Sequence, residues 1–513
     1  MQLDSKTKEI TAGSKELELL AESFHDDQLR LRMMTDPVSV FGTPFSLTAE
    51  IKRFAEMMMG DEKFRRGLYE SPRATVEAHG LRIDPMTIRA MWDGRAMREG
   101  LLTDADMNSD GIRHLNAFND LKREFFKSML TKQSANSAFE RWRTRQIERC
   151  ATEMDRANAR SIVHAPATFE LAAGCSVGCW FCGVSAENYR GAVSYDAIKS
   201  IWLDTLAGLN EVIGDAAGKA FLYWGTEPFD NPDYESYCLD LKQVCGGFPQ
   251  TTTAVPMRDP GRTWELLKLS TAHGCQINRF SILTPRILAS TLKTFSPEQL
   301  LFVELVLQNK GSMLVKANAG KARNSRKLED DRNHLARELA EYASPALQAA
   351  KPSTIACVSG FLFNLAKKDL RLISPCSASD QHPDGYIVFE EGKFNTGAEA
   401  VELMRGMVAR HMNVEPHESS LISFRPDFGF VGQQNGFSLN NEYDTVTIQN
   451  PNHGPLMRRL GELISTGGHS AARIRQSLSG EFSIDDNQAR SVLRFLFDKG
   501  LLAERAASET SAH

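Results

Sequence analysis

Three cysteines lie close together in the middle of the chain, in the string CSVGCWFC that contains Cys175, Cys179 and Cys182. Thiolates at this spacing can converge on one iron–sulfur cube, because Gly178 permits a tight turn between them. Three ligands leave the fourth iron without a protein ligand, and chemistry can take place there. A zinc knuckle is the alternative, but zinc normally takes four ligands and no second CxxC or HxxxH pair follows at knuckle spacing. The string therefore predicts a [4Fe–4S] cluster held by these three cysteines.

A second motif, YWGTEP, follows about forty-five residues later and contains Gly225, Thr226 and Glu227. A glycine turn lets backbone groups approach a ligand, and a carboxylate can pair with a ligand's ammonium group. A Glu-Pro strand exit alone is usually only a turn. Its place after the cysteines makes Glu227 a candidate ligand-binding residue.

Both motifs follow short apolar strands in a region where strands alternate with longer amphipathic segments. Such strand–helix repeats predict an α/β fold with a parallel sheet whose functional loops follow the strand ends. We expect a partial (β/α)6 TIM-like barrel over residues 161–350, with five or six strands. The other expected parts are a polar, partly ordered leader (1–45), a helical region with its connector (46–160), a strand and hairpin segment (351–415) and a C-terminal domain (416–513).

The cysteine string resembles the CxxxCxΦC motif of the radical S-adenosylmethionine enzymes, with Phe181 at the aromatic position, and GTEP resembles their GGEP motif. The resemblance covers about residues 165–380. It implies that the three cysteines hold the cluster and that S-adenosylmethionine chelates the open iron and is cleaved to a 5′-deoxyadenosyl radical. It also implies that Glu227 holds the cosubstrate amine, with Gly225 and Thr226 beside it, and that Phe181 lies near the adenine. Further expected cosubstrate contacts at strand ends are Thr253, Arg279, Ser281 and Gln308.

The six other cysteines are scattered, so auxiliary clusters are not expected and most of these thiols read as small buried hydrophobes. Cys376 ends the strand RLISPC and opens a polar turn, where a thiol could give a hydrogen atom to a carbon radical. The strings around Cys175, Glu227 and Cys376 resemble the radical S-adenosylmethionine epimerases that convert L- to D-residues in ribosomally made peptides of the proteusin type. That resemblance makes Cys376 the expected hydrogen donor, with Cys357 in reserve. Two alternatives stay open: both thiols are packing residues, or the enzyme is a radical cyclase that makes thioether or carbon–carbon links.

The C-terminal domain has three strand-like segments followed by three helical ones, a β3α3 winged-helix order. The last helix, DNQARSVLRFLFDKG, has Asp485 or Asp486 as its expected N-cap and Gly500 at its C-terminal end. The order resembles the PqqD-like peptide-recognition elements, which implies capture of a precursor's leader peptide. Winged helices also bind DNA, and an iron–sulfur sensor of that type is the remaining alternative, although the helix is rich in Asp and has a weak footprint for phosphates. Within the N-terminal region, residues 54–81 resemble helical leader-peptide domains of the nitrogen-fixation-associated and nitrile-hydratase-related kinds.

The composition is that of a globular chain and not of a disordered or fibrous one, with 42% hydrophobic residues, 24% charged residues and a net charge of −5. This charge balance speaks against general nucleic-acid binding. No apolar run approaches the roughly 20 residues of a membrane span, and no signal peptide is recognisable, so we expect a cytoplasmic protein. The expected partners are a precursor peptide and an electron donor such as flavodoxin or ferredoxin.

Overall fold

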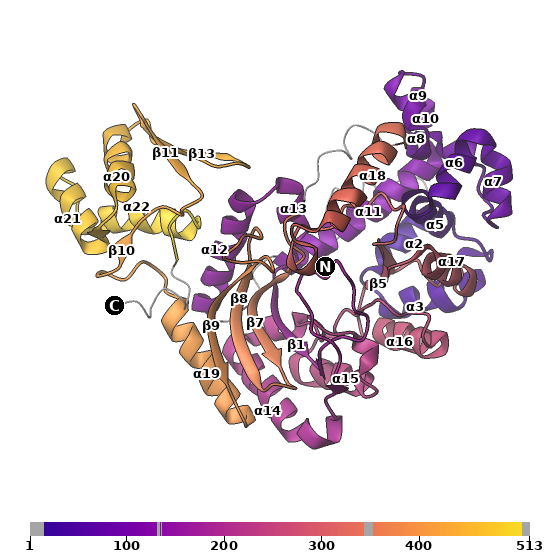
Figure 1. The fold of residues 1–513 in the computed structure, drawn as a ribbon, viewed down its shortest axis with the longest axis horizontal. Helices are drawn as coiled ribbons and strands as arrows, with labels where there is room; N and C mark the ends of the chain where they lie inside the picture. Colours follow the sequence, from indigo (N-terminus) through magenta and orange to yellow (C-terminus); the bar gives the residue numbers. More distant parts are fainter. Residues whose placement is uncertain (1–14, 131–133, 135, 343–351, 505–513) are drawn as a thin grey trace.

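The computed structural model describes residues 15–130, 134, 136–342 and 352–504, and they form a mixed α/β protein (Figure 1). The first fourteen residues of the expected leader and the expected boundary near residue 350 lie outside these ranges. Figure 1 shows a central body of strands and helices, with an N-terminal group of helices on one side and a C-terminal module on the other. None of the helices in the described ranges combines the length and apolar character of a membrane-crossing segment.

A four-stranded sheet in the order β1-β7-β8-β9 forms part of the central body. β1 (Ala165–Glu170) pairs in parallel with β7 (Val358–Asn364), whereas β8 (Asp369–Pro375) and β9 (Tyr386–Lys393) add antiparallel neighbours. The strand and hairpin segment predicted after residue 350 is thus present and is joined to the edge of β1. One face of the sheet packs on an aromatic core with α12 (Ser137–Glu153), α14 (Tyr195–Ile213) and α19 (Gly397–His411).

A separate three-stranded parallel sheet contains β4 (Thr252–Thr253), β5 (Asn278–Ile282) and β6 (Val303–Leu307). The predicted strand AFLYWG contributes only an isolated parallel bridge, from Phe221 to Thr168 of β1. The described strands therefore form several small sheets that close no barrel. The strand–helix alternation is present as predicted: α14, α15 (Tyr234–Cys245), α16 (Pro260–Ala272), α17 (Pro285–Thr294) and α18 (Arg326–Tyr342) follow successive strand segments.

The N-terminal region is helical, and its apolar side covers the outer face of β5 and β6. Phe280, Leu305 and their neighbours in these strands share a core with α2, α3, α5 and α11. The helices of this region are α2 (Lys15–Ser23), α3 (Asp27–Thr35), α4 (Pro37–Phe41), α5 (Leu47–Gly60), α6 (Glu62–Glu70), α7 (Pro72–Ala78), η1 (Pro85–Ile88), α8 (Arg89–Trp92), α9 (Gly94–Arg98), α10 (Asp104–Met107), α11 (Asp110–Leu130) and α13 (Arg156–Ser161).

The C-terminal module contains an antiparallel sheet, β11 (Gly429–Gln433), β12 (Gly436–Asn440) and β13 (Thr445–Gln449), followed by α20 (Gly454–Thr466), α21 (Ala471–Phe482) and α22 (Asp486–Asp498). The first predicted strand is split, because its start, β10 (Leu421–Ile422), pairs instead with β14 (His469–Ser470). Asp485 is the N-cap of α22, and Gly500 follows the helix with φ +62°, as its position in the sequence suggested.

Candidate functional site

The three clustered cysteines lie in a loop that is closed at its base by two short strands, β2 (Ala172–Ala173) and β3 (Gly191–Ala192). Gly174 opens the loop with φ +79°, and a Cβ there would lie 2.3 Å from the Asn188 carbonyl oxygen. Gly178, between the first two cysteines, has φ +64°. Both conformations favour glycine, so the local sequence determines how the thiols are presented.

The three thiols lie near one another and are only partly exposed. Burial raises the pKa of Cys175 to about 11, and it does the same for Cys179, where the Cys182 and Cys175 thiols add to the effect. Three thiolates are the protein ligands of an iron–sulfur cube with one open iron, whereas a structural zinc ion takes four ligands. The chemistry of this donor set therefore fits a [4Fe–4S] cluster.

One acidic side chain near the cysteine loop, that of Asp230, already has hydrogen-bond and ion-pair partners. Asp230 accepts from the Ser176 amide at 2.8 Å and from Arg258 at 2.8 Å, and Arg258 also donates to Ser176 Oγ. Ser176 directly follows Cys175, so this triad fixes the start of the loop. This contact was not predicted from the sequence, where its only signal is an aspartate three residues after Glu227.

Glu227 is a buried carboxylate, only 3% exposed, at the start of η3 (Pro228–Asp230). It accepts from Thr253 Oγ1 at 2.6 Å, from the Ala254 amide at 2.8 Å and from the Phe229 amide at 3.1 Å. Burial raises its pKa, and these three donors oppose that shift. Within the described part of the chain no ion pair involves Glu227. A buried carboxylate of this kind is suited to a ligand's ammonium group.

Glu170, at the end of β1, is a site residue that the sequence analysis missed. Its Oε1 accepts from the Gly225 amide at 2.8 Å, and its Oε2 accepts from Asn364 at 2.5 Å. Burial raises its pKa, and both hydrogen bonds lower it. Glu170 therefore ties the end of β1 to the turn that carries Thr226 and Glu227, and a lone glutamate ending an apolar strand was the available signal.

The remaining predicted cosubstrate contacts fall into two groups. Thr253 is buried and bonded to Glu227, so the structure brings those two together. Arg279 pairs at 2.9 Å with Glu304, the residue opposite it on β6, and Ser281 lies on the same face of β5 as Arg279. Gln308 follows β6, and its backbone amide donates to the carbonyl oxygen of Ile282. Phe181 stacks edge-on with Trp180 and lies below the Lys316 ammonium, 5.6 Å from its ring centre.

Cys376 follows β8, and a chain of backbone contacts links it to the cysteine loop. Its amide donates to Gly385 O at 3.0 Å; two residues earlier, Pro383 O accepts from Gly320, and Lys321 donates to Cys182 O. The Cys376 thiol is fully buried, and burial raises its pKa well above the usual value.

The reserve candidate, Cys357, lies elsewhere, beside Tyr223 in a small apolar cluster. Burial raises its pKa to about 11, while the Arg279 charge opposes the shift.

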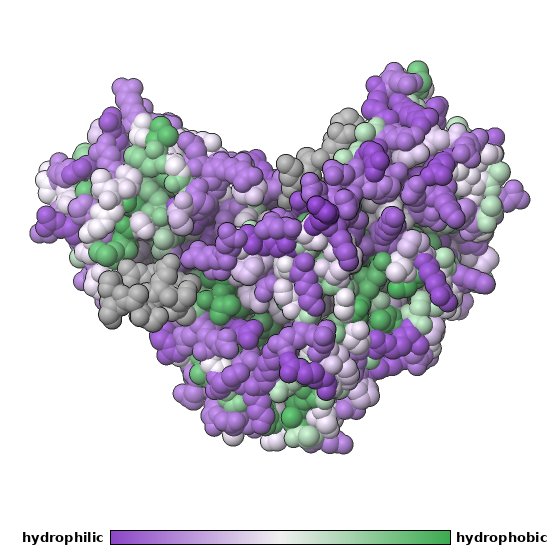
Figure 2. Space-filling model, in the orientation of Figure 1, coloured by the Kyte–Doolittle hydropathy of each residue, from purple (hydrophilic) through white to green (hydrophobic). Residues whose placement is uncertain are grey.

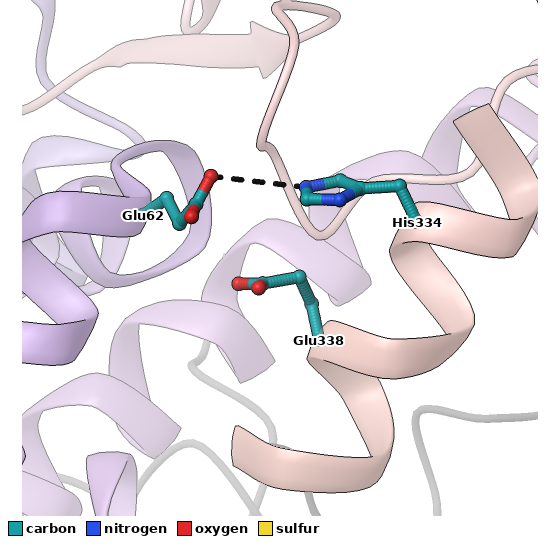
Figure 3. Close-up of side chains that lie close together, drawn as sticks. All are labelled: Glu62, His334 and Glu338. Carbon is teal, nitrogen blue, oxygen red and sulfur yellow. Dashed lines mark ion pairs between the residues drawn. The ribbon is translucent and has the colours of Figure 1, made fainter. Parts of the chain in front are cut away.

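A different group of ligand-type side chains lies between α6 and α18, where Glu62, His334 and Glu338 point toward one another (Figure 3). His334 Nε2 lies 3.8 Å from Glu62, and Arg66 also pairs with Glu62 at 2.7 Å. Arg65 donates to Glu338 through Nε at 3.1 Å and through an NH2 group at 2.6 Å. The arginines already neutralise both carboxylates, so this group reads as a structural ion-pair network.

Comparisons with known proteins give one informative result. No family model and no solved structure matches the chain. Among curated proteins, it is 34% identical over 441 residues to the "Uncharacterized protein y4wI" of Sinorhizobium fredii (strain NBRC 101917 / NGR234). The match covers 83% of this chain and 82% of that protein.

Proposed function

The chain belongs to the family of the y4wI protein of Sinorhizobium fredii, and we propose that it is a radical S-adenosylmethionine epimerase converting L- to D-residues in a ribosomally made precursor peptide. The observation that carries the proposal is the pairing of two features. Three neighbouring thiols have the sequence spacing expected for an open-cornered cluster, and nearby Glu227 is a buried carboxylate with three hydrogen-bond donors and no ion pair among the described residues. A cluster ligand that carries an ammonium group fits both features.

Cys175, Cys179 and Cys182 would hold the [4Fe–4S] cluster, which when bound and reduced supplies the electron that cleaves S-adenosylmethionine to a 5′-deoxyadenosyl radical. Glu227 binds the cosubstrate ammonium, and Thr253 and the Ala254 amide orient its carboxylate. Glu170 holds the Gly225 turn in place. The parallel order β4-β5-β6 and the bridge from Phe221 to β1 support a partial, open barrel around this site.

In this proposal Cys376 gives a hydrogen atom to the α-carbon radical of the substrate, on the face opposite to abstraction. Two observations support it. The hairpin that bonds the Cys376 amide also contacts the cysteine loop, and burial keeps the thiol protonated, which is the form that donates hydrogen. Cys357 is the reserve donor, beside Tyr223.

The C-terminal module would be a PqqD-like winged-helix element that binds the leader peptide of the precursor. Its support is the order of three antiparallel strands and three helices, with β11 and β13 as unpaired sheet edges that a peptide strand can extend. Figure 2 shows this module and the N-terminal helices as two lobes on either side of a hollow over the central body. A leader on one lobe would hold the core peptide near the site at high effective concentration. The remaining parts of the proposal are a flavodoxin- or ferredoxin-type electron donor and a cytoplasmic location.

Two experiments test the proposal. In one, the protein is purified anaerobically and assayed for bound metal and for cleavage of S-adenosylmethionine. In the other, it is co-expressed with a precursor peptide in deuterated water. We expect iron and sulfide in the protein, 5′-deoxyadenosine in the reaction and one solvent deuteron at each inverted α-carbon. Cys376→Ala should still release 5′-deoxyadenosine but give no D-residues, and Cys357→Ala is its matched control. A product that lacks two hydrogens would instead identify a cyclase. Zinc in place of iron would contradict the proposal, and an iron–sulfur cluster with no release of 5′-deoxyadenosine would favour the sensor instead.

A further inference from the structure

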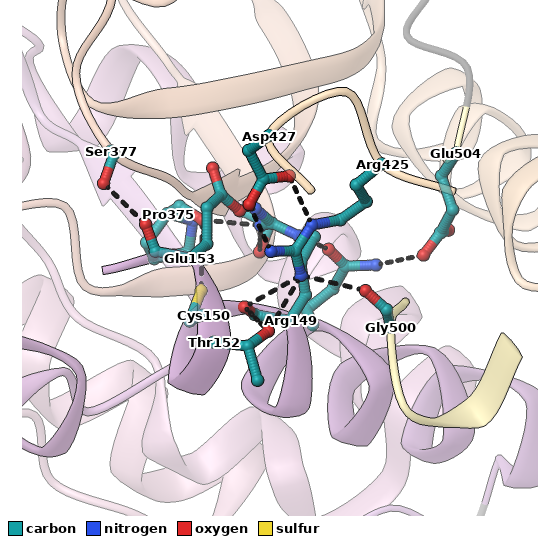
Figure 4. Close-up of polar contacts among 12 residues, drawn as sticks. Arg149, Cys150, Thr152, Glu153, Pro375, Ser377, Arg425, Asp427, Gly500 and Glu504 are labelled. Carbon is teal, nitrogen blue, oxygen red and sulfur yellow. Dashed lines mark hydrogen bonds and ion pairs between the residues drawn. The ribbon is translucent and has the colours of Figure 1, made fainter. Parts of the chain in front are cut away.

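A second thiol lies next to the predicted donor. Cys150 of α12 and Cys376 are both fully buried, and the Cys150 thiol donates to Pro375 O at 3.2 Å (Figure 4). That carbonyl belongs to the peptide unit that ends at the Cα of Cys376. The sulfur of Cys150 is therefore about one peptide unit from Cys376, and the Cys150 thiol is close enough to contribute to the raised pKa of the Cys376 thiol.

Charged groups surround this pair of cysteines. Arg149 donates to Pro375 O at 2.5 Å and pairs with Glu153, and Ser377 donates to Glu153 O at 2.9 Å. The Arg149 and Glu153 charges act on both thiols. Cys245, by contrast, lies in the main apolar core, where burial alone raises its pKa to about 12. The strand end that carries Cys376 is thus clamped to the helix that carries Cys150.

Hydrogen donation leaves a thiyl radical on Cys376, and because the residue is fully buried, a thiol inside the protein lies closer to this radical than a reductant in solution. The first partner of this short-lived radical is therefore a group within the protein, whereas the longer-lived disulfide can exchange with dithiols and glutathione during local opening of the structure. Cys150 is the thiol in that position. We propose that Cys150 resolves the radical on Cys376 by forming a disulfide with it, an inference that rests on the proposed function.

The Cys376 thiyl sulfur and the Cys150 sulfur form an S–S bond, the Cys150 S–H bond breaks, and its proton passes to the Glu153 carboxylate. The one surplus electron passes to the oxidised form of the one-electron carrier that drives the enzyme. A dithiol reductant then returns both cysteines to thiols before the next turnover.

The first experiment asks whether the two thiols can reach each other in the full chain, without any turnover. The protein is equilibrated anaerobically in an oxidising glutathione buffer, its free thiols are alkylated, and it is digested with trypsin. Cleavage after arginine and lysine places Cys150 in peptide 150–156 and Cys376 in peptide 372–393. We expect these two peptides linked, with a mass 2 Da below the sum of the free thiol forms. Absence of that link, or a link from Cys376 to Cys357 instead, overturns the proposal.

The second experiment asks whether the disulfide forms in turnover, using the reconstituted enzyme, the precursor peptide and no added dithiol. We expect one Cys150–Cys376 link for each D-residue formed, and none without peptide. Cys150→Ser keeps the hydrogen-bond donor to Pro375 O but cannot form the link. It should give the first-turnover D-residue in full and lose about tenfold or more in multiple-turnover yield.

Unchanged multiple-turnover yield in Cys150→Ser, or D-residues without the link in the wild-type enzyme, overturns the inference while the proposed function stands. If the wild-type enzyme makes no D-residue at all, the proposed function itself fails. The glutathione experiment needs no turnover, so it distinguishes that failure from a failure of the two thiols to reach each other.

Discussion

The backbone amide of Gly225 donates to Oε1 of Glu170 at 2.8 Å, which ties the end of β1 to the turn that precedes Glu227. This contact needs a glycine, because a Cβ at position 225 would lie 2.8 Å from the same oxygen. This hydrogen bond joins the end of β1 to the YWGTEP motif, across 55 positions of the sequence.

Gly225→Ala should therefore displace the Glu170 carboxylate and break its bond to the turn. We expect a loss of about 1–3 kcal/mol in the free energy of unfolding, because a buried carboxylate loses a donor. The Kd for S-adenosylmethionine should rise as well. Denaturant unfolding and equilibrium dialysis measure the two effects. Gly480→Ala is the control, since nothing lies within 4 Å of the Cβ that it adds; equal stability of the two variants would contradict the role given to Gly225.

The raised pKa of Glu227 leads to a prediction about how the affinity for S-adenosylmethionine depends on pH. The ionised form binds an ammonium group, so affinity for S-adenosylmethionine should fall as the pH drops through this raised pKa, at a higher pH than for an ordinary glutamate. Thr253→Val removes one donor to the carboxylate and should move the fall to still higher pH. Calorimetric titration across pH gives both profiles. A profile for Thr253→Val that lies at lower pH than the wild type's would contradict this.

Without cosubstrate, the contribution of Glu227 to the free energy of unfolding should depend on pH in the opposite direction: it should be larger at low pH than at high pH. The folded chain holds the Glu227 proton more tightly than the unfolded chain does, so this group's contribution to stability is lost as the pH rises through its folded pKa. Glu227→Gln should consequently be at least as stable as wild type at pH 8 and yet lose cosubstrate binding. Thermal unfolding at pH 5 and pH 8 tests this, and a variant that is less stable only at pH 8 would refute it.

Arg425 should hold the C-terminal module on α12. It is buried, it pairs with Asp427 at 2.7 Å, and it donates to Thr152 Oγ1 at 2.9 Å and to Gly500 O at 3.0 Å (Figure 4). Arg425→Met should cost about 3–5 kcal/mol, the usual result of breaking a buried charged network. Limited proteolysis should then cut faster between residues 412 and 420. The exposed Arg473→Met is the control, and equal cleavage rates in the two variants would show that other contacts hold the module.

Patterns local to one segment were readable from the sequence. The strand–helix alternation and the hairpin of β7 and β8 were anticipated, because each depends on residues within a few positions of one another. The N-cap of α22 is a further example: Asp485 accepts from the Gln488 amide, three residues away.

Long-range contacts were not readable in the same way. Pairing of β7 with β1 joins residues nearly two hundred positions apart, and no local signal specifies it. The segment 220–224 has strand-like residues, but tertiary packing leaves it with a single bridge. The contact of Cys150 with Pro375 was equally hidden, since an isolated cysteine in a helix reads as packing.

The Glu62, His334 and Glu338 group leads to a prediction about metals. Because Arg65 and Arg66 already neutralise the carboxylates, a divalent cation would have to displace an arginine whose side chain is only 1% exposed. Added Zn²⁺ or Mn²⁺ should therefore not stabilise the chain through these residues. The measurement is the shift in Tm on adding metal, compared between the wild type and His334→Ala. Any metal binding at the cysteines contributes equally to both proteins and cancels in this comparison. We expect equal shifts in the two proteins, since the arginines occupy the place that a cation would take; a shift lost with His334 would instead make this group a metal site.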